Sequence, residues 1–313
     1  MYPNVKVKEI WLPADRIDEK LDAALAAGNA ADVIMLSPDW KGLRAKWFED
    51  LTPYLKRDNI DESLFTSGAD DGYVLRDGKR EGMPTTQSCF LIAYNKEIFD
   101  KAGVPYPTND WTWDDFAEIA KKVSSGSGAN RTYAMVSHWI LNSFAPYLYG
   151  GTPYNEDWTK QTIDSPETIR ALELIEELIN AKAIPDDAAS KSIPMDAMFV
   201  TGRAAMYPLG LFEAGEIAKK IGDKFEWGVV LPPKDPNGKH TNIKFQTGWA
   251  MNKDSKNKEA AWAYIKTVSL NKEVNDIYAK VGIPALKESA ETTFAEMTIP
   301  TTDIKQTEYL KGL

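Results

Sequence analysis

Strand-like and helix-like segments alternate along the whole chain, and this alternation is what most constrains the fold. Short runs rich in apolar and β-branched residues lie at 5–10, 32–36, 89–94, 133–136, 204–207, 227–231 and 247–251. Apolar residues at helical spacing mark the segments between them, at 13–27, 113–123, 166–179 and 255–270. Such alternation predicts an α/β protein in which helices cover the sheets.

Three local patterns make finer predictions. The run 32–36 is apolar without interruption, which is typical of a strand buried on both faces in a parallel sheet. Thr112 is placed to cap the helix that follows it, and Ser165-Pro166 is a favoured helix start. The helix after Ser165 is expected to bury Ile169, Leu172, Ile175, Leu178 and Ile179. The segment 232–238 is interpreted as a surface loop.

Composition argues against several classes of function. The 313 residues include 37 basic and 46 acidic side chains, for a net charge of -9, so nucleic acid and anionic membranes are unfavourable partners. The single cysteine, Cys89, excludes an internal disulfide. No apolar run approaches the roughly 20 residues of a membrane span. Residues 1–4 are not a signal peptide, so either the protein is cytosolic or an export segment is absent from this chain.

Familiar catalytic and metal-binding motifs are missing. The two histidines, His138 and His240, are far apart in sequence and form no close-spaced metal-binding pair. Cys89 lies in an apolar run, where a thiol is usually inert. We therefore predict no catalytic residue, no metal site and no cofactor. Sequence spacing leaves open two distant carboxylates that face one another, as in a glycosidase.

Several segments, in order, resemble family 1 extracellular solute-binding proteins of ABC importers, the maltose-binding-protein-like group. These segments are 31–34, 94–104, 107–116, 199–206, 247–251, 255–262 and 282–285. Each motif is short, but their shared order covers nearly the whole chain. Family members normally carry a strand and a helix before the part that matches residues 2–5, and we expect these to be absent here, together with the export signal.

The resemblance implies a two-lobed, type II periplasmic-binding-protein-like fold with mixed sheets flanked by helices and an interlobe cleft. Lobe 1 is expected to hold residues 1–94 plus 246–290, and lobe 2 residues 95–245 plus 291–313. The implied function is capture of a sugar or oligosaccharide in the cleft and delivery to the permease transmembrane subunits by lobe closure. The implied protein is a monomer and not an enzyme, and is periplasmic or extracellular, with a lipoprotein anchor compatible with the family.

Candidate ligand-binding residues follow from what a sugar needs, namely paired hydrogen-bond groups and an apolar plate. Ser37, Asp39 and Trp40 follow the strand 32–36 at its carboxyl end, where open α/β sheets bind ligands. Gln87 precedes the first expected crossing strand, and Trp249 lies at the second. Turn, cap or packing roles are the alternative for each of these residues.

The second lobe offers four more candidates. Trp139, Asn142 and Tyr147 come after the strand that ends at Val136. Phe212 lies in Gly210-Leu211-Phe212, where relatives often carry a Gly-x-Trp contact, so the resemblance implies a stacking role. Core packing is the alternative for the aromatic residues.

Other functions stay open at this point. A carbohydrate-active enzyme needs a carboxylate pair that the sequence can neither place nor exclude. A binding protein for a polyamine or a phosphate ester is compatible with the same fold, as is a sensor partner that does not serve transport.

Overall fold

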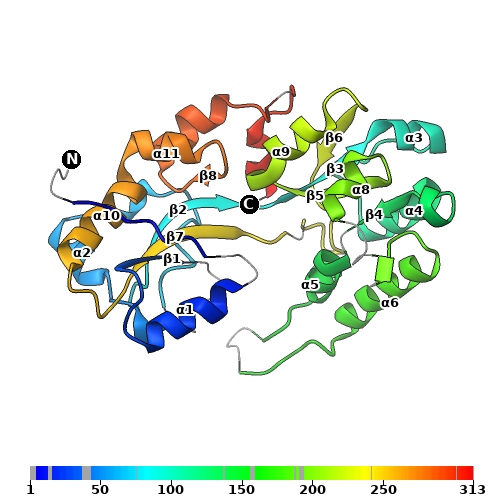
Figure 1. Ribbon diagram of the computed structural model, residues 1–313. Coiled ribbons are helices and arrows are strands. Elements are labelled where there is room, and N and C mark those ends of the chain that lie inside the picture. Colours follow the sequence, from blue (N-terminus) through cyan, green and yellow to red (C-terminus); the bar gives the residue numbers. More distant parts are fainter. Residues whose placement is uncertain are drawn as a thin grey trace. The chain divides into compact units, whose positions relative to one another are not determined.

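The computed structural model contains two compact units (Figure 1). It describes residues 5–12, 16–36, 44–75, 77–136, 138–155, 159–186, 188–189, 194–240, 242–300 and 302–312. Unit 1 comprises Met1–Ser88 and Phe245–Glu296, and unit 2 comprises Cys89–Lys244 and Met297–Leu313. The chain therefore changes unit at 88/89, 244/245 and 296/297, where the sequence-based expectation was 94/95, 245/246 and 290/291.

Unit 1 is built on a four-stranded sheet with the order β1-β7-β2-β8. Its described pairings, β1 with β7, β7 with β2 and β2 with β8, are all antiparallel. Its strands are β1 (Val33–Leu36), β2 (Met83–Ser88), β7 (Phe245–Met251) and β8 (Ile283–Pro284). Its helices are α1 (Ile17–Ala26), α2 (Thr52–Arg57), α10 (Lys258–Leu270), α11 (Lys272–Tyr278) and α12 (Lys287–Ser289). Short single turns lie at Ala45–Trp47, Glu62–Leu64 and Ala290–Phe294.

The prediction of a doubly buried parallel strand at 32–36 is wrong. β1 pairs antiparallel with β7, and Met35 is 45% exposed while Ile34 and Leu36 are buried. Asp32 O accepts a hydrogen bond from Asn252 N at 2.9 Å, so by the alternation of an antiparallel ladder Ile34 and Leu36 bond toward β7. The backbone of Val33 and Met35 faces the other way, and no strand of the described residues pairs with that outer edge.

The expected strand at 5–10 is also wrong. Residues 5–12 form neither helix nor strand, although their sequence alternates in the manner of a strand. Trp11 in this segment is 86% exposed. A strand forms only where a neighbouring strand accepts and donates its backbone hydrogen bonds, and no described strand pairs with this segment.

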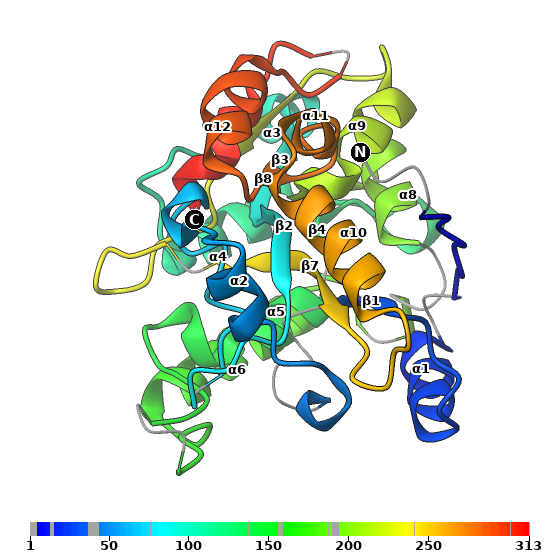
Figure 2. The ribbon, with the colours of Figure 1, turned by 90° about the vertical axis from the view of Figure 1, so that its left-hand side faces the viewer.

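Helices cover both faces of the sheet in unit 1. On one face, Trp262 and Ile265 of α10 pack with Met83 and Met251. Figure 2 shows α10 next to β7 and β2, which it contacts. On the other face, the α1 residues Leu21 and Leu25 pack with Ile34, Leu36 and Ala250.

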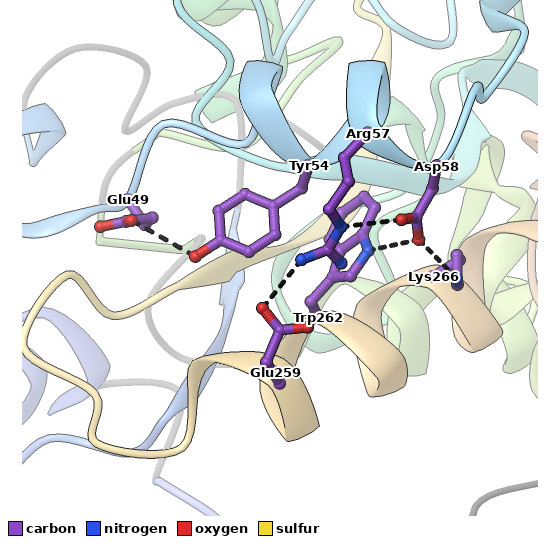
Figure 3. Close-up of polar contacts among 7 residues, drawn as sticks. All are labelled: Glu49, Tyr54, Arg57, Asp58, Glu259, Trp262 and Lys266. Carbon is purple, nitrogen blue, oxygen red and sulfur yellow. Dashed lines mark hydrogen bonds and ion pairs between the residues drawn. The ribbon is translucent and has the colours of Figure 1, made fainter.

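A polar network ties α2 to α10 (Figure 3). Asp58, which ends α2, accepts hydrogen bonds from Lys266 Nζ at 2.6 Å, Trp262 Nε1 at 2.9 Å and Arg57 Nε at 2.9 Å. Arg57 Nη1 donates to Glu259 at 2.8 Å. The bonds from Lys266, Trp262 and Arg57 hold the pKa of Asp58 well below its usual range.

Unit 2 is built on a second four-stranded sheet with the order β4-β5-β3-β6. β4 and β5 are parallel, whereas β3 is antiparallel to both β5 and β6. Its strands are β3 (Phe90–Asn95), β4 (Tyr133–Met135), β5 (Ala204–Gly210) and β6 (Trp227–Val230). Its helices are α3 (Lys96–Ala102), α4 (Trp113–Val123), α5 (His138–Leu148), α6 (Pro166–Asn180), α8 (Met195–Val200) and α9 (Leu211–Ile221), with short turns at Gly128–Asn130 and Gln306–Gly312.

The two predicted helix caps of unit 2 are confirmed. Thr112 Oγ1 accepts from Asp115 N at 3.2 Å, and Asp115 Oδ2 accepts from Thr112 N at 2.8 Å, which completes a capping box for α4. Ser165 Oγ accepts from Thr168 N at 3.3 Å at the start of α6. Helix starts are encoded locally, which is why sequence alone located them.

The predicted buried face of α6 is only partly right. Ile175 and Leu178 are buried and Ile179 is half-buried, but Ile169 and Leu172 are each 48% exposed. The other buried members of α6 are Thr168, Ala171 and Leu174. The buried stripe therefore starts one residue earlier than predicted, at Thr168, Ala171 and Leu174, and α6 packs against α5.

The last described residues complete the core of unit 2. Tyr309 is fully buried and its hydroxyl donates to Leu209 O at 3.1 Å. Cys89 Sγ donates to Tyr309 O at 3.2 Å, and burial raises the pKa of this thiol to about 12. The mixed α/β architecture expected from the sequence is confirmed. No helix among the described residues combines the length and the apolar character that crossing a membrane requires.

Candidate ligand-binding site

One edge of the sheet in unit 2 leads into the helices that carry the candidate residues of that unit. β4 and β5 run parallel, so they end at the same edge and lead into α5 and α9. β3 starts there, because Phe90 lies opposite Gly210 in the antiparallel register. Carboxyl ends of strands followed by helices are the usual position of ligand sites in α/β folds.

Phe212 is an exposed aromatic side chain held in a fixed place at this edge. Its ring lies directly over the backbone of Gly210, where any Cβ would overlap it. It meets the ring of Phe90 edge-on, with centroids 6.5 Å apart, yet Phe212 remains 52% exposed. A ring that is fixed at one side and open at the other is suited to stacking on a ligand.

Glu213 fixes the first turn of α9 beside Phe212. Its Oε1 accepts from Gly210 N at 3.3 Å, and its Oε2 accepts from Tyr207 OH at 3.0 Å. Burial raises the pKa of Glu213. Both carboxylate oxygens are thus engaged in positioning the helix start.

Asn242 extends the same edge beyond β3. Its Oδ1 accepts from Phe90 N at 3.0 Å and its Nδ2 donates to Phe90 O at 2.7 Å. The side chain therefore replaces a strand partner for Phe90 and fixes the segment that leads into β7.

A cavity of about 540 Å³ opens next to Asn242, within unit 2. Tyr147, from the last turns of α5, contributes a partly exposed aromatic ring. The other lining residues are Gly150, Gly151, Asp235, Asn237, Lys239, His240, Asn242, Ile243 and Lys244. Its volume falls within the roughly 300–1,000 Å³ of small-molecule sites.

Asp235 organises the turn that forms one wall of this cavity. It is 7% exposed, and its Oδ1 accepts from Asn237 N at 2.8 Å and Lys239 N at 2.9 Å. His240 Nδ1 lies 2.6 Å from Pro232 O, so this nitrogen carries the proton and donates. The loop expected at 232–238 is therefore a tightly bonded turn.

Only some of the candidate residues of unit 1 are among the residues that the structure describes. Ser37, Asp39 and Trp40 lie outside the described residues. Gln87 is buried, with its Nε2 donating to Thr66 Oγ1 at 2.9 Å, and it lies opposite Gln246 in the ladder of β2 and β7.

Gln246 and Trp249 have contacts within unit 1. Gln246 Nε2 donates to Gly68 O at 2.6 Å, so Gln87 and Gln246 together hold the loop 66–68 on the sheet. Trp249 is half-buried and meets Tyr264 edge-on, with ring centroids 5.6 Å apart.

Of the unit 2 candidates, Phe212 follows β5 at the edge described above, and Tyr147 lines the cavity next to Asn242. Trp139 and Asn142 fall within α5, but their side chains lie outside the described residues. Sequence analysis did not select Asp235, Asn237 or Asn242. A signal existed in Asp235-Pro236-Asn237-Gly238, which is turn chemistry, but nothing in it shows that Asp235 is buried.

The described residues show no group of three or more His, Cys, Asp or Glu side chains placed to hold a metal ion.

Comparison with known proteins identifies related chains. The family model described as "bacterial extracellular solute-binding protein" matches residues 1–274. A putative binding protein of Brucella abortus is 24% identical over 271 residues, covering 83% of this chain and 63% of that protein. A maltotriose-binding protein of Pyrococcus abyssi is 25% identical over 306 residues, covering 92% of this chain and 61% of that protein. The chain thus spans less than two thirds of the length of these curated relatives.

A solved structure shares the fold over nearly the whole chain. The ABC substrate-binding protein of Listeria monocytogenes, in complex with cycloalternan, superposes with a TM-score of 0.84 at 28% identity. The match covers 96% of this chain and 77% of that one. The two-lobed fold expected from the sequence is confirmed by this likeness.

Proposed function

Because this chain belongs to the bacterial extracellular solute-binding protein family, we propose that it is the solute-binding component of an ABC importer and captures a sugar or oligosaccharide. The relatives named for maltotriose and cycloalternan support the choice of a carbohydrate. The observation that carries the proposal is the Phe212 ring, fixed over Gly210 and 52% exposed at a strand-end edge.

Sugar chemistry explains why such a ring matters. A pyranose presents apolar C–H faces and a rim of hydroxyls, so its site needs an aromatic plate with hydrogen-bond donors and acceptors around it. Phe212 and Tyr147 supply two aromatic faces from α9 and α5, and the turn at Asp235 supplies polar groups.

Capture proceeds by closure of the two units around the solute. A ligand shifts an open–closed equilibrium only if it binds the closed state more tightly, so it must contact both units. We assign the contacts of unit 1 to Ser37, Asp39, Trp40, Gln87 and Trp249, and those of unit 2 to Trp139, Asn142, Tyr147 and Phe212.

The reaction is binding and release, without a change in the sugar. No catalytic residue, metal or cofactor takes part in this proposal. The protein works as a monomer on the outer side of the membrane and delivers its solute to the permease transmembrane subunits.

Calorimetric titration tests the proposal with maltose, maltotriose and cycloalternan against putrescine and glycerophosphocholine. We expect binding of a sugar without turnover, and a loss of about tenfold in affinity, or about 1.4 kcal/mol, for Phe212→Ala. The matched control is Tyr106→Ala, an exposed aromatic that packs on Tyr94, at the opposite end of β3 from Phe90.

Three results would overturn the proposal. They are binding of putrescine or glycerophosphocholine with no sugar bound, hydrolysis of the sugar by the purified chain, and equal effects of Phe212→Ala and Tyr106→Ala.

A further inference from the structure

The cavity in unit 2 presents polar groups whose hydrogen-bonding capacity is not used within the described residues. Asp235 Oδ1 accepts two backbone N–H groups, but Oδ2 accepts none there. Asn237 Nδ2 likewise donates to no described residue. Both atoms reach the cavity wall at Gly150, where a Cβ would lie 2.7 Å from Asn237 Nδ2 and 3.2 Å from Asp235 Oδ2.

Gly150 lies directly against these two groups. Its φ of +85° is in the left-handed region that favours glycine, and any side chain would press against the Asp235 and Asn237 termini. A carboxylate acceptor and an amide donor therefore lie next to a bare stretch of backbone.

The hydrogen-bonding groups at this place suit a hydroxylated ligand. Asp235 lies next to Asn237 at the wall, and Lys239 and Lys244 line the same cavity, so acidic and basic side chains are both present. A hydroxyl can donate to Asp235 Oδ2 and accept from Asn237 Nδ2, which satisfies both groups. Tyr147 lines the same cavity and offers a ring face to the apolar side of such a ligand.

We propose that this cavity binds one ring of a neutral oligosaccharide, with Asp235 Oδ2 and Asn237 Nδ2 holding its hydroxyls and Tyr147 packing on its face. This inference rests on the proposed function and deepens it, because it makes the solute an oligosaccharide and not a monosaccharide. The cavity adjoins the Phe212 plate through Asn242, which bonds Phe90, whose ring meets Phe212. In this proposal the solute extends from Phe212 past Asn242 into the cavity.

The experiment uses the full chain. A glycan array with mono- to hexasaccharides identifies the sugar that binds best, and calorimetry then measures its affinity for each variant. Asp235→Asn keeps the Oδ1 acceptor of the turn and replaces the Oδ2 acceptor by a donor. The control is Asp196→Asn, which removes a carboxylate of unit 2 that pairs with Lys220 outside the cavity lining.

We expect Asp235→Asn to weaken oligosaccharide binding at least tenfold while Asp196→Asn leaves it unchanged. Tyr147→Ala should weaken binding, and Tyr147→Phe should restore most of it, because the ring face matters more than the hydroxyl. Melting temperatures of the variants identify any loss that comes from unfolding. If a folded Tyr147→Ala variant binds the oligosaccharide with wild-type affinity, the inference is contradicted whatever the result for Asp235→Asn.

The outcomes separate the two proposals. If no array sugar binds the wild-type chain, the proposed function fails and the inference fails with it. If an oligosaccharide binds and Asp235→Asn retains wild-type affinity while Phe212→Ala loses it, the function stands and the cavity is not part of the site. Binding as strong for a monosaccharide as for its oligomers also refutes the inference.

Discussion

The contribution of Asp58 to the stability of unit 1 can be tested directly by substitution. The substitution Asp58→Ala removes the acceptor of three hydrogen bonds, two of which, from Trp262 and Lys266, join the end of α2 to α10 (Figure 3). The indole N–H of Trp262 then loses its partner in a side chain that is only 1% exposed. An unsatisfied buried donor costs about 1–3 kcal/mol, and the lost bond from Lys266 adds to it, so we expect a loss of about 2–4 kcal/mol.

Glu259→Ala is the matched control, because it removes an ion pair from the same network at its exposed side. Glu259 pairs with Arg57 and its side chain is 74% exposed, so this change should leave stability nearly unaltered. Asp58→Asn should fall between the two, because it keeps an oxygen for the Trp262 indole and loses the charge.

Urea denaturation followed by tryptophan fluorescence measures these effects as shifts in midpoint at constant slope. The pKa of Asp58 is lower in the folded chain than its ordinary value. The carboxylate therefore stabilises the fold above the unfolded pKa of about 3.9, and this contribution is lost as the pH falls through the folded pKa. The difference in free energy of unfolding between wild type and Asp58→Ala should be constant from about pH 7 to pH 5. It should become smaller in stronger acid.

Equal destabilisation by Asp58→Ala and Glu259→Ala would refute this reasoning, since it would mean that the buried indole contributes nothing. A difference in free energy of unfolding that increases below pH 4 would refute the stabilising role of the ionised Asp58 carboxylate.

Three further predictions concern other parts of the fold. Cys89, whose pKa burial raises to about 12, should react with a thiol reagent at pH 8 about 10³-fold more slowly than an ordinary cysteine, and at the normal rate in urea; equal rates in both conditions would contradict its burial. Thr112→Ala should cost about 1 kcal/mol in urea denaturation through loss of the capping box with Asp115, and an unchanged midpoint would show that the cap is dispensable. Gly248→Ala should lower the free energy of unfolding by about 1–3 kcal/mol, because its Cβ would press on Met83 O. A melting temperature equal to wild type would show that the backbone of β2 can shift without loss of stability.

Features encoded by neighbouring residues were the ones that sequence could predict. The cap of α4 needs only Thr112 and Asp115, three residues apart, and it formed as expected. The direction of β1 was not predictable in this way, because its partner β7 comes more than 200 residues later. An apolar run reports burial and not the direction of the strand beside it.

The candidate site shows the same division. Phe212 was located through its resemblance to a family segment, and it lies at the sheet edge where its residue type suits a ligand. Asp235 was missed, since the turn sequence shows that it bends the chain but not that Gly150, far earlier in sequence, lies against it. Ser37, Asp39 and Trp40 remain predictions.

The outer edge of β1, which pairs with no strand of the described residues, bears on self-association at high protein concentration. Edge strands with unpaired N–H and C=O groups act as templates for strands of other molecules. β1 has four residues, and only Val33 and Met35 direct their backbone outward, so one added strand gains few hydrogen bonds. We therefore expect any self-association through this edge to be weak and to grow with protein concentration. A lysine at position 35 should suppress it, which light scattering of Met35→Lys against wild type can show.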